Sequence, residues 1–275
     1  MRKRDEGLAV DDHDIDEDKD PRFVTALARG LDILRSFRRN EIELGNQDLA
    51  ARTGLPKATV SRLTYTLGKQ GYLVYNAASG KYRLGTPVLS LGYTCLSGMG
   101  VRQVARPLMQ ELADHTGLSV ALGGRDRFSM IYLECCRGDS PVTLQLDVGS
   151  HLKLTTSAMG RAYLAGLPDT ERAALMDKLE AHENERSPGR WPGIRDGILQ
   201  AVEEYRMKGY CLSLGAWKTE VNAAGVPYVP RDGSPVLAFN CGGPSFLLHR
   251  KTLEEDHAPR LVELVRRIDA VLFNS

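Results

Sequence analysis

Apolar residues near the start of the chain recur at the spacing of a helix. Five of them follow one another at intervals of three or four residues: Val24, Leu27, Leu31, Leu34 and Phe37. This spacing places them along one face. The opposite face carries four arginines: Arg22, Arg29, Arg35 and Arg38. The pattern predicts an amphipathic helix that begins after Pro21 and ends near Arg39.

Two more helices, joined by a tight turn, are predicted over residues 46–70. Asn46 or the preceding glycine can cap a short helix over residues 47–52. Gly54 can adopt the positive φ that a tight turn needs. Pro56 suits the first turn of the next helix, because its missing N–H has no helical partner there.

The second of these helices has a polar and basic outer face. Val60, Leu63 and Leu67 fall on one side, and the other side carries Ala58, Ser61, Arg62, Tyr65 and Lys69. Two helices joined by a three-residue turn, the second of this character, are typical of a helix-turn-helix that reads the major groove of DNA. An ordinary helical hairpin with a solvated face would show the same pattern.

A hairpin follows directly, which favours DNA binding over the plain helical hairpin. Residues 71–75 are predicted as a strand, 76–80 as a polar turn and 81–84 as the return strand. A hairpin in this position is a wing, and its basic residues can touch phosphates. The residues expected to contact DNA are Lys57, Thr59, Ser61, Arg62, Tyr65, Lys81 and Arg83.

The formal net charge of +1 conceals an uneven distribution of charge along the chain. Residues 1–20 hold four basic and nine acidic side chains, as expected of a disordered acidic leader. Residues 21–100 hold eleven basic and four acidic side chains, whereas residues 101–275 hold 21 and 22. A basic module beside a nearly neutral one is typical of a DNA-binding domain attached to a domain of another kind.

Several of these segments resemble a known family. PRFVTALARGLDILRSF, DLAARTGLPKATVSRLTYTLGKQGYL, GKYRLG and LSLG, in this order, are similar to the DNA-binding domain of IclR-type transcriptional regulators. The resemblance continues through the second domain and covers about residues 21–275. It implies a regulator that binds double-stranded operator DNA as a homodimer or tetramer.

The segment between the two domains is apolar and predicted to be helical. It spans residues 86–97 and ends in Gly98-Met99-Gly100. The resemblance implies that this helix joins the domains and helps to build the dimer, and a simple spacer is the alternative. The expected organisation is a leader (1–20), a winged helix-turn-helix (21–85), a linker (86–100) and an effector-binding domain (101–275).

The second domain is predicted to mix strands with inserted helices. Helices are expected over residues 101–115, 158–165, 169–179, 193–207 and 259–273, and strands over residues 119–123, 129–135, 142–147, 226–229 and 236–240. This order favours an α+β domain with an antiparallel sheet. The resemblance implies a GAF-like architecture that binds a small organic effector, such as an organic or aromatic acid.

Three parts of this domain are expected to form the effector pocket. Residues 154–162 lead into a helix whose free N–H groups can attract an anion, although an ordinary capped helix would look the same. Relatives often carry an acidic residue at Ser213, a cysteine at Ala223 and serines at Asn240 and Gly242, so this pocket is expected to be roomier and less polar. The predicted set is Ala158, Met159, Gly160, Ser213, Trp217, Ala223, Asn240 and Gly242. Plain core is an equal alternative for three aromatic or sulfur-containing candidates: Met159, Trp217 and Phe239.

Other classes of protein find little support. No stretch approaches the ~18 apolar residues of a membrane span, and the N-terminus lacks the apolar core of a signal peptide, so a cytoplasmic protein is expected. The five cysteines show no CxxC spacing, although a redox role of Cys135 and Cys136 stays open.

The sequence contains no G-x-S-x-G, no H-E-x-x-H, no P-loop and no complete Rossmann motif, and its six histidines are not at metal-ligand spacing, so neither an enzyme nor a cofactor is expected. The remaining alternative function is an architectural DNA-binding protein with a vestigial, non-sensing C-terminal domain. A small molecule that shifts thermal stability or operator affinity would discriminate between the two.

Overall fold

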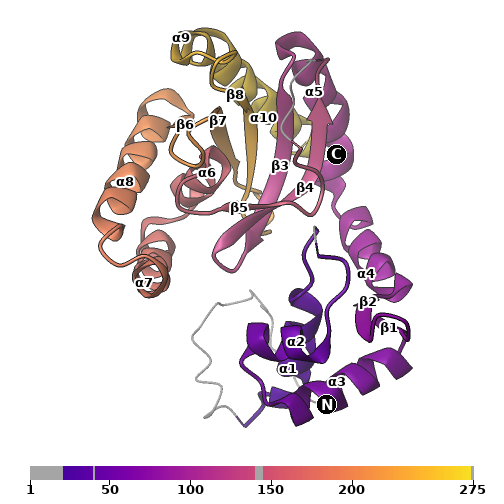
Figure 1. Cartoon of the computed structure of the whole chain (residues 1–275). Coiled ribbons are helices and arrows are strands. Elements are labelled where there is room, and N and C mark those ends of the chain that lie inside the picture. The colour runs from indigo at the N-terminus through magenta and orange to yellow at the C-terminus, as the bar shows by residue number, and fades with distance from the viewer. Residues whose placement is uncertain (1–20, 40, 140–144, 274–275) are drawn as a thin grey trace, which may run out of the picture. The chain divides into compact units, whose positions relative to one another are not determined.

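The computed structural model describes residues 21–39, 41–139 and 145–273 (Figure 1). The chain divides into two compact units at Cys95–Leu96. The predicted leader, residues 1–20, lies outside the described residues, as do residues 142–144 of a predicted strand. Every helix within the described ranges is too short or too polar to span a lipid bilayer.

The first unit packs three helices against a two-stranded antiparallel hairpin. Its elements are α1 (Thr25–Arg35), α2 (Asn46–Thr53), α3 (Lys57–Lys69), β1 (Leu73–Asn76) and β2 (Lys81–Leu84). Five buried apolar residues form its core: Ile33, Leu44, Leu49, Val60 and Leu73. Gly54 ends α2 with a φ of 69°, the left-handed conformation that turns the chain sharply toward α3. This arrangement confirms the predicted helix-turn-helix, and the hairpin takes the place of a wing.

The buried face of α1 differs from the predicted apolar stripe. Leu27 and Leu31 are 63% and 50% exposed, whereas Gly30 and Ile33 are buried. Apolar spacing identifies a helix, but it does not say which part of a broad apolar face the neighbouring helices cover. The prediction of the helix is confirmed, and α1 leaves leucines on the surface of its unit.

Helix α4 (Thr86–Ser97) follows the wing over the predicted range of residues, and none of its side chains is buried. Three of its apolar side chains, Leu89, Leu91 and Tyr93, are among the most exposed large apolar side chains of the described residues. Helix α5 (Gly100–Thr116) begins after a break of two residues and carries four buried apolar residues.

The second unit contains a six-stranded antiparallel sheet in the order β5-β4-β3-β8-β7-β6 (Figure 1). Its strands are β3 (Ser119–Asp126), β4 (Ser129–Arg137), β5 (His151–Lys153), β6 (Cys211–Leu214), β7 (Val221–Tyr228) and β8 (Leu237–Pro244). Its remaining helices are α6 (Ala158–Gly166), α7 (Asp169–Arg186), α8 (Trp191–Lys208), α9 (Arg250–Thr252), the π-helix η1 (Leu253–His257) and α10 (Ala258–Phe273). The predicted α+β class with an antiparallel sheet is confirmed.

Helices cover both faces of this sheet and give the unit two cores. Helices α5 and α10 pack on one face, where Val120, Leu122 and Phe239 are buried. Helices α6, α7 and α8 pack on the other face, where Ala121 and Ala238 are buried. Alternate residues of a strand point to opposite faces, so the central strands contribute to both cores.

The strands of this unit differ from the predicted strands in two places. Residues 145–147 are not in a strand, because the chain turns at Asp147–Ser150 before it forms β5. The short edge strand β6 was not predicted as a strand at all. Three- and four-residue strands give too little alternation to be recognised by pattern.

Two glycines allow close packing around the start of α6, one against the sheet and one against the turn before the helix. A Cβ atom at Gly225 of β7 would collide with the carbonyl oxygen of Ala158. A Cβ atom at Gly160 would collide with the carbonyl oxygen of Leu154, just before the helix. These glycines fix where the N-terminus of α6 meets the sheet.

Candidate functional site

One face of helix α3 packs into the core of the first unit, and the opposite face points outward. Val60 and Thr64 are fully buried. The Thr64 hydroxyl donates a hydrogen bond to Asn46 Oδ1 at 3.2 Å, which ties α3 to the start of α2. The orientation of the outward side chains therefore follows from this packing.

The outward face of α3 carries cations and hydroxyl groups. Four of the predicted DNA contacts on this helix are exposed: Lys57, Ser61, Arg62 and Tyr65. Thr59 is half-buried, and the Lys69 ammonium lies 5.4 Å from the centre of the Tyr65 ring. Such a face can contact base edges and phosphates.

The wing presents two further cations from a hairpin that a carboxylate holds in place. Lys81 and Arg83 are exposed on β2. Glu43 accepts hydrogen bonds from Asn76 Nδ2 at 3.0 Å and from the Ser79 hydroxyl at 2.8 Å, which fixes the turn of the wing. These hydrogen bonds, with a smaller contribution from the nearby Lys81 and Arg83 charges, lower the pKa of Glu43.

An apolar groove of about 720 Å³ separates α1 from α3 within the first unit. Leu27 and Leu31 line it from α1, and Leu63 and Leu67 line it from α3. Arg62 also lines this groove, so it stands at the edge of the outward face of α3. Exposed apolar surface beside a basic face marks a place where another chain can pack.

A small cavity lies in the second unit between the sheet and the start of α6. Its lining residues are Tyr132, Leu146, Leu152, Ser157, Ala158, Ser213, Trp217, Val221, Ala223, Asn240 and Gly242. The volume is about 20 Å³, which is the space of one water molecule. Nine of the lining residues are buried, and only Leu146 and Trp217 are half-exposed.

Most polar groups around this cavity already have partners. The Ser213 hydroxyl donates to the Thr156 carbonyl oxygen at 2.8 Å. Ser157 caps α6: its hydroxyl oxygen accepts from Gly160 N at 3.1 Å. The exception is Asn240, whose Nδ2 donates to the Tyr132 hydroxyl oxygen at 3.3 Å while its Oδ1 has no partner.

The structure brings together most of the residues predicted for the pocket. Six of them line the cavity: Ala158, Ser213, Trp217, Ala223, Asn240 and Gly242. Met159 and Gly160 do not line it, because Met159 is buried in the core against Gly123 and Gly160 packs against Leu154. Phe239 is buried in the core on the opposite face of the sheet.

Five lining residues were missed by the sequence reasoning: Tyr132, Leu146, Leu152, Ser157 and Val221. Ser157 lies inside a segment that was singled out, and its position before a helix is a detectable capping signal. The others come from strands and loops whose pairing no local pattern discloses.

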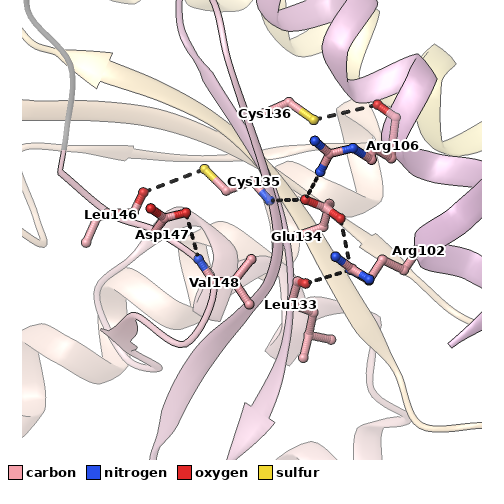
Figure 2. Close-up of polar contacts among 9 residues, drawn as sticks. All are labelled: Arg102, Arg106, Leu133, Glu134, Cys135, Cys136, Leu146, Asp147 and Val148. Atoms are coloured by element: carbon pink, nitrogen blue, oxygen red, sulfur yellow. Dashed lines mark hydrogen bonds and ion pairs between the residues drawn. The ribbon is translucent and has the colours of Figure 1, made fainter. Parts of the chain in front are cut away.

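A buried glutamate joins the sheet to the start of α5 (Figure 2). Glu134 of β4 is 2% exposed, and its Oε1 accepts from Arg106 Nη1 at 2.6 Å and from the backbone N–H of Cys135 at 3.1 Å. Its Oε2 lies 2.9 Å from Arg102 Nε, which also donates to the Leu133 carbonyl oxygen. The first turns of α5 are therefore anchored to β4.

Cys135 and Cys136 point to opposite faces of the sheet and belong to different cores (Figure 2). The Cys135 Sγ lies 3.7 Å from the Leu146 carbonyl oxygen, and the Cys136 Sγ lies 3.6 Å from that of Arg106. Burial raises the pKa of Cys135 to about 11 and also raises that of Cys136. The thiolate is the reactive form, so this environment disfavours the redox alternative.

Metal binding receives no support from the part of the chain that is described. Among those residues, no group of three or more His, Cys, Asp or Glu side chains is arranged to hold a metal ion. The two sites offer groups suited to contact: cations and hydroxyl groups on α3 and the wing, and a polar-ended apolar cavity beside α6.

Comparisons with known proteins match both units. The family model for the C-terminal domain of bacterial IclR transcriptional regulators matches residues 93–270, and the model for the IclR helix-turn-helix domain matches residues 26–77. The HTH-type transcriptional regulator TsaQ1/TsaQ2 of Comamonas testosteroni is 36% identical over 250 residues, which cover 90% of this chain and 88% of the relative.

Solved structures agree with this similarity. An IclR family transcriptional regulator from Brucella abortus superposes with a TM-score of 0.84 at 48% identity, covering 93% of this chain and 95% of that one. An IclR homologue from Microbacterium hydrocarbonoxydans, solved in complex with 4-hydroxybenzoate, gives a TM-score of 0.70 at 21% identity and covers 91% of this chain and 100% of its own. The second likeness concerns the fold alone.

Proposed function

Because the chain belongs to the IclR family of bacterial transcriptional regulators, we propose that it binds operator DNA as a dimer and that a small organic effector modulates this binding. The observation that carries the proposal is the presence of two different sites in two separate units. One is an exposed cationic face on a winged helix-turn-helix, and the other is a closed, polar-ended cavity. The family consists of regulators, and the chain is accordingly not an enzyme.

The proposed DNA contacts divide between α3 and the wing. Ser61, Arg62 and Tyr65 contact base edges, with Lys57 and Thr59 near the start of the helix. Lys81 and Arg83 of the wing contact phosphates, which positions the domain without reading sequence. A DNA-binding regulator of a bacterial family acts where the DNA is, so a cytoplasmic location is part of this proposal.

The proposed dimer rests on apolar surface that the described residues of a single chain leave exposed. Helix α4 has no buried residue although Leu89, Leu91 and Tyr93 are apolar, and Leu27 and Leu31 of α1 are exposed as well. A second copy that covers these helices would bury this surface, and two DNA-binding units would read two half-sites of an approximate palindrome. A tetramer of two such dimers is compatible with the same surfaces.

The proposed effector is a small organic acid that binds at the cavity beside α6. The N-terminus of α6 lies on the cavity wall through Ser157 and Ala158, and the N–H groups of a first helical turn favour anions. The homologue with 4-hydroxybenzoate shows that a protein of this fold can hold an aromatic acid. In this organisation residues 21–85 bind DNA, residues 86–100 link the domains and residues 101–275 bind the effector.

The test combines DNA binding with a ligand screen. Fluorescence anisotropy with DNA fragments from upstream of the gene measures operator affinity, and a thermal-shift screen of organic acids identifies ligands of the folded protein. We expect at least one stabilising acid to change operator affinity several-fold. If no stabilising ligand changes DNA affinity, the protein is an architectural DNA binder rather than a sensor.

The oligomeric state has its own test. Light scattering at micromolar concentration should give at least the mass of a dimer. A monomer that binds one half-site at full strength would contradict this part of the proposal.

A further inference from the structure

The inner end of the cavity is formed by two buried polar side chains that meet across one strand. Tyr132 of β4 and Asn240 of β8 are 3% and 7% exposed. Strand β3 lies between β4 and β8, so the contact of 3.3 Å between Asn240 Nδ2 and the Tyr132 hydroxyl oxygen spans the middle of the sheet. Both side chains line the cavity.

This pair leaves the Asn240 carbonyl oxygen and the Tyr132 hydroxyl hydrogen without partners among the described residues. Asn240 Oδ1 is fully buried and accepts no hydrogen bond. The Tyr132 hydroxyl accepts from Asn240, and its own hydrogen finds no acceptor among the described residues. Burial raises the pKa of Tyr132, which keeps this hydroxyl protonated and therefore a donor. A buried polar group without a hydrogen-bond partner costs about 1–3 kcal/mol of free energy. A ligand group that bonds to both side chains would therefore bind favourably here.

A hydroxyl group is the natural complement of this pair. A hydroxyl has one hydrogen to donate to Asn240 Oδ1 and lone pairs to accept from the Tyr132 O–H. The complement does not depend on which way the amide is turned. If the amide oxygen and nitrogen are exchanged, the Tyr132 O–H donates to the amide oxygen. The amide N–H then faces the ligand as a donor and the tyrosine oxygen as an acceptor. A ligand hydroxyl can again satisfy both.

The outer end of the cavity is apolar, and one aromatic side chain covers it. Leu146 and Trp217 are the half-exposed lining residues, so a ligand enters between them. The Leu146 carbonyl oxygen is held by Arg137 Nη2 at 2.6 Å. Trp217 lies in the connection between β6 and β7, and the Lys218 ammonium lies 4.7 Å from the centre of its ring.

The size of the cavity requires one of these covers to move. An apolar cavity that binds benzene measures about 150 Å³, whereas this one measures about 20 Å³. Gly215, with a φ of 66°, begins the connection that carries Trp217, and the other residues of this connection, Ala216, Lys218, Thr219 and Glu220, are exposed. The exposed neighbours of Trp217 and the hydrogen bond that holds the Leu146 carbonyl oxygen favour Trp217 as the cover that moves.

We propose that the cavity selects a planar aromatic ligand whose ring hydroxyl binds between Asn240 and Tyr132, and that the ring displaces Trp217 and then packs against its indole. This inference rests on the proposed function, because it names the class of effector that the same pocket takes. It assigns Tyr132 and Asn240 as the residues that recognise the hydroxyl. It assigns Trp217 as the residue that limits the size of the ring.

The test uses pairs of ligands that differ in one hydroxyl group: 4-hydroxybenzoate with benzoate, and 4-hydroxyphenylacetate with phenylacetate. Calorimetric titration of the full-length protein should show that the hydroxylated member of at least one pair binds about tenfold more tightly. In Tyr132→Phe and in Asn240→Leu, this preference should fall to less than threefold. Tyr228→Phe is the matched control, because Tyr228 is buried on the opposite face of the same sheet, and it should keep the preference.

A second readout follows Trp217 directly. The chain has two tryptophans, so in a Trp191→Phe background the fluorescence reports on Trp217 alone. Its emission should shift on binding of the hydroxylated ligand, and the deoxy ligand should need about tenfold higher concentration to give the same shift.

The outcomes separate the two proposals. Equal affinities within every pair overturn the hydroxyl inference, and the effector site survives because ligands still bind. Tight binding without a change in Trp217 emission overturns the role of Trp217 as the cover. If none of these four acids binds, the inference is wrong, while the proposed effector site is judged by the thermal-shift screen of organic acids and DNA binding by anisotropy.

Discussion

Arg62 stands where the outward face of α3 meets the groove beside α1. If its guanidinium donates hydrogen bonds to a base edge, Arg62→Ala should weaken specific DNA binding by about 1–3 kcal/mol. Anisotropy with operator and scrambled DNA measures the difference. Lys81→Ala on the wing is the comparison, and it should weaken all DNA about equally and reduce the salt dependence. Operator affinity equal to the wild type in a folded Arg62→Ala protein would refute the base contact.

The buried cysteines allow a prediction about reactivity and pH. Burial raises the pKa of Cys211 and of Cys241 to about 12, and that of Cys135 to about 11. A raised pKa lowers the thiolate fraction at pH 8, by roughly 100-fold for a shift of two pH units. In a Cys95→Ser variant, which removes the exposed thiol, native protein should therefore react slowly with a disulfide reagent and faster as the pH rises. Denaturation should release four reactive thiols, and rapid labelling of the native protein would contradict the burial.

At the scale of elements, the placement of α6 depends on a glycine in the facing strand. Because a Cβ at Gly225 would collide with the Ala158 carbonyl oxygen, Gly225→Ala should push α6 away from β7. We expect a loss of about 1–3 kcal/mol in the free energy of unfolding, together with weaker effector binding. Urea denaturation and ligand titration measure the two effects.

Gly193→Ala on α8 provides the control. A Cβ at this helical position meets nothing within 4 Å, and alanine favours a helix by up to about 1 kcal/mol over glycine. Stability should therefore be unchanged or higher. A Gly225→Ala protein as stable as the wild type would show that α6 is not held by this contact.

The elements with strong local signals were predictable from sequence, and those made by distant pairing were not. The turn at Gly54 and the paired strands of the wing were found because local residues determine them. The sequence did not predict which part of the apolar face of α1 is buried, because the neighbouring helices decide it. It did not predict the short strand β5 either, because that strand forms only by pairing with β4. Pattern alone contains neither kind of information.

The same distinction applies to the pocket. Ser213, Ala223 and Asn240 were identified through the family resemblance and line the cavity. Tyr132 was missed, because it is one of several apolar and aromatic residues in a strand, and only the register of β4, β3 and β8 brings its hydroxyl to Asn240. Met159 was placed in the pocket although it belongs to the core, because neighbouring positions in a helix can face different surroundings.

At the scale of the whole molecule, the effector response should be separable from DNA binding. Ala223 is buried beside a cavity of about 20 Å³, so Ala223→Phe should fill the pocket and abolish the effector response. Intrinsic operator affinity should survive, because Ala223 belongs to the second unit and the basic face to the first. Ala181→Phe, the same change at an exposed site of α7, should keep the response. A melting curve checks that Ala223→Phe still folds, since overpacking costs about 1–3 kcal/mol.

Linkage adds a reciprocal requirement. If effector changes operator affinity by some factor, operator must change effector affinity by the same factor. Equal effector affinity with and without operator, measured by calorimetry, would show that the pocket binds a ligand without acting as the switch.

Strand β8 has one further consequence, which concerns how ligand preference can change over time. Asn240 faces the pocket, while Phe239 and Cys241 on either side of it belong to the opposite core. The same alternation holds at Ser213 beside Leu212 and at Ala223 beside Ala224. Residues that line the pocket thus alternate with residues of the opposite core. Substitutions that accumulate among related proteins can therefore change the pocket residues and leave the core residues unchanged. A biosensor library randomised at positions 213, 223 and 240 would exploit the same separation.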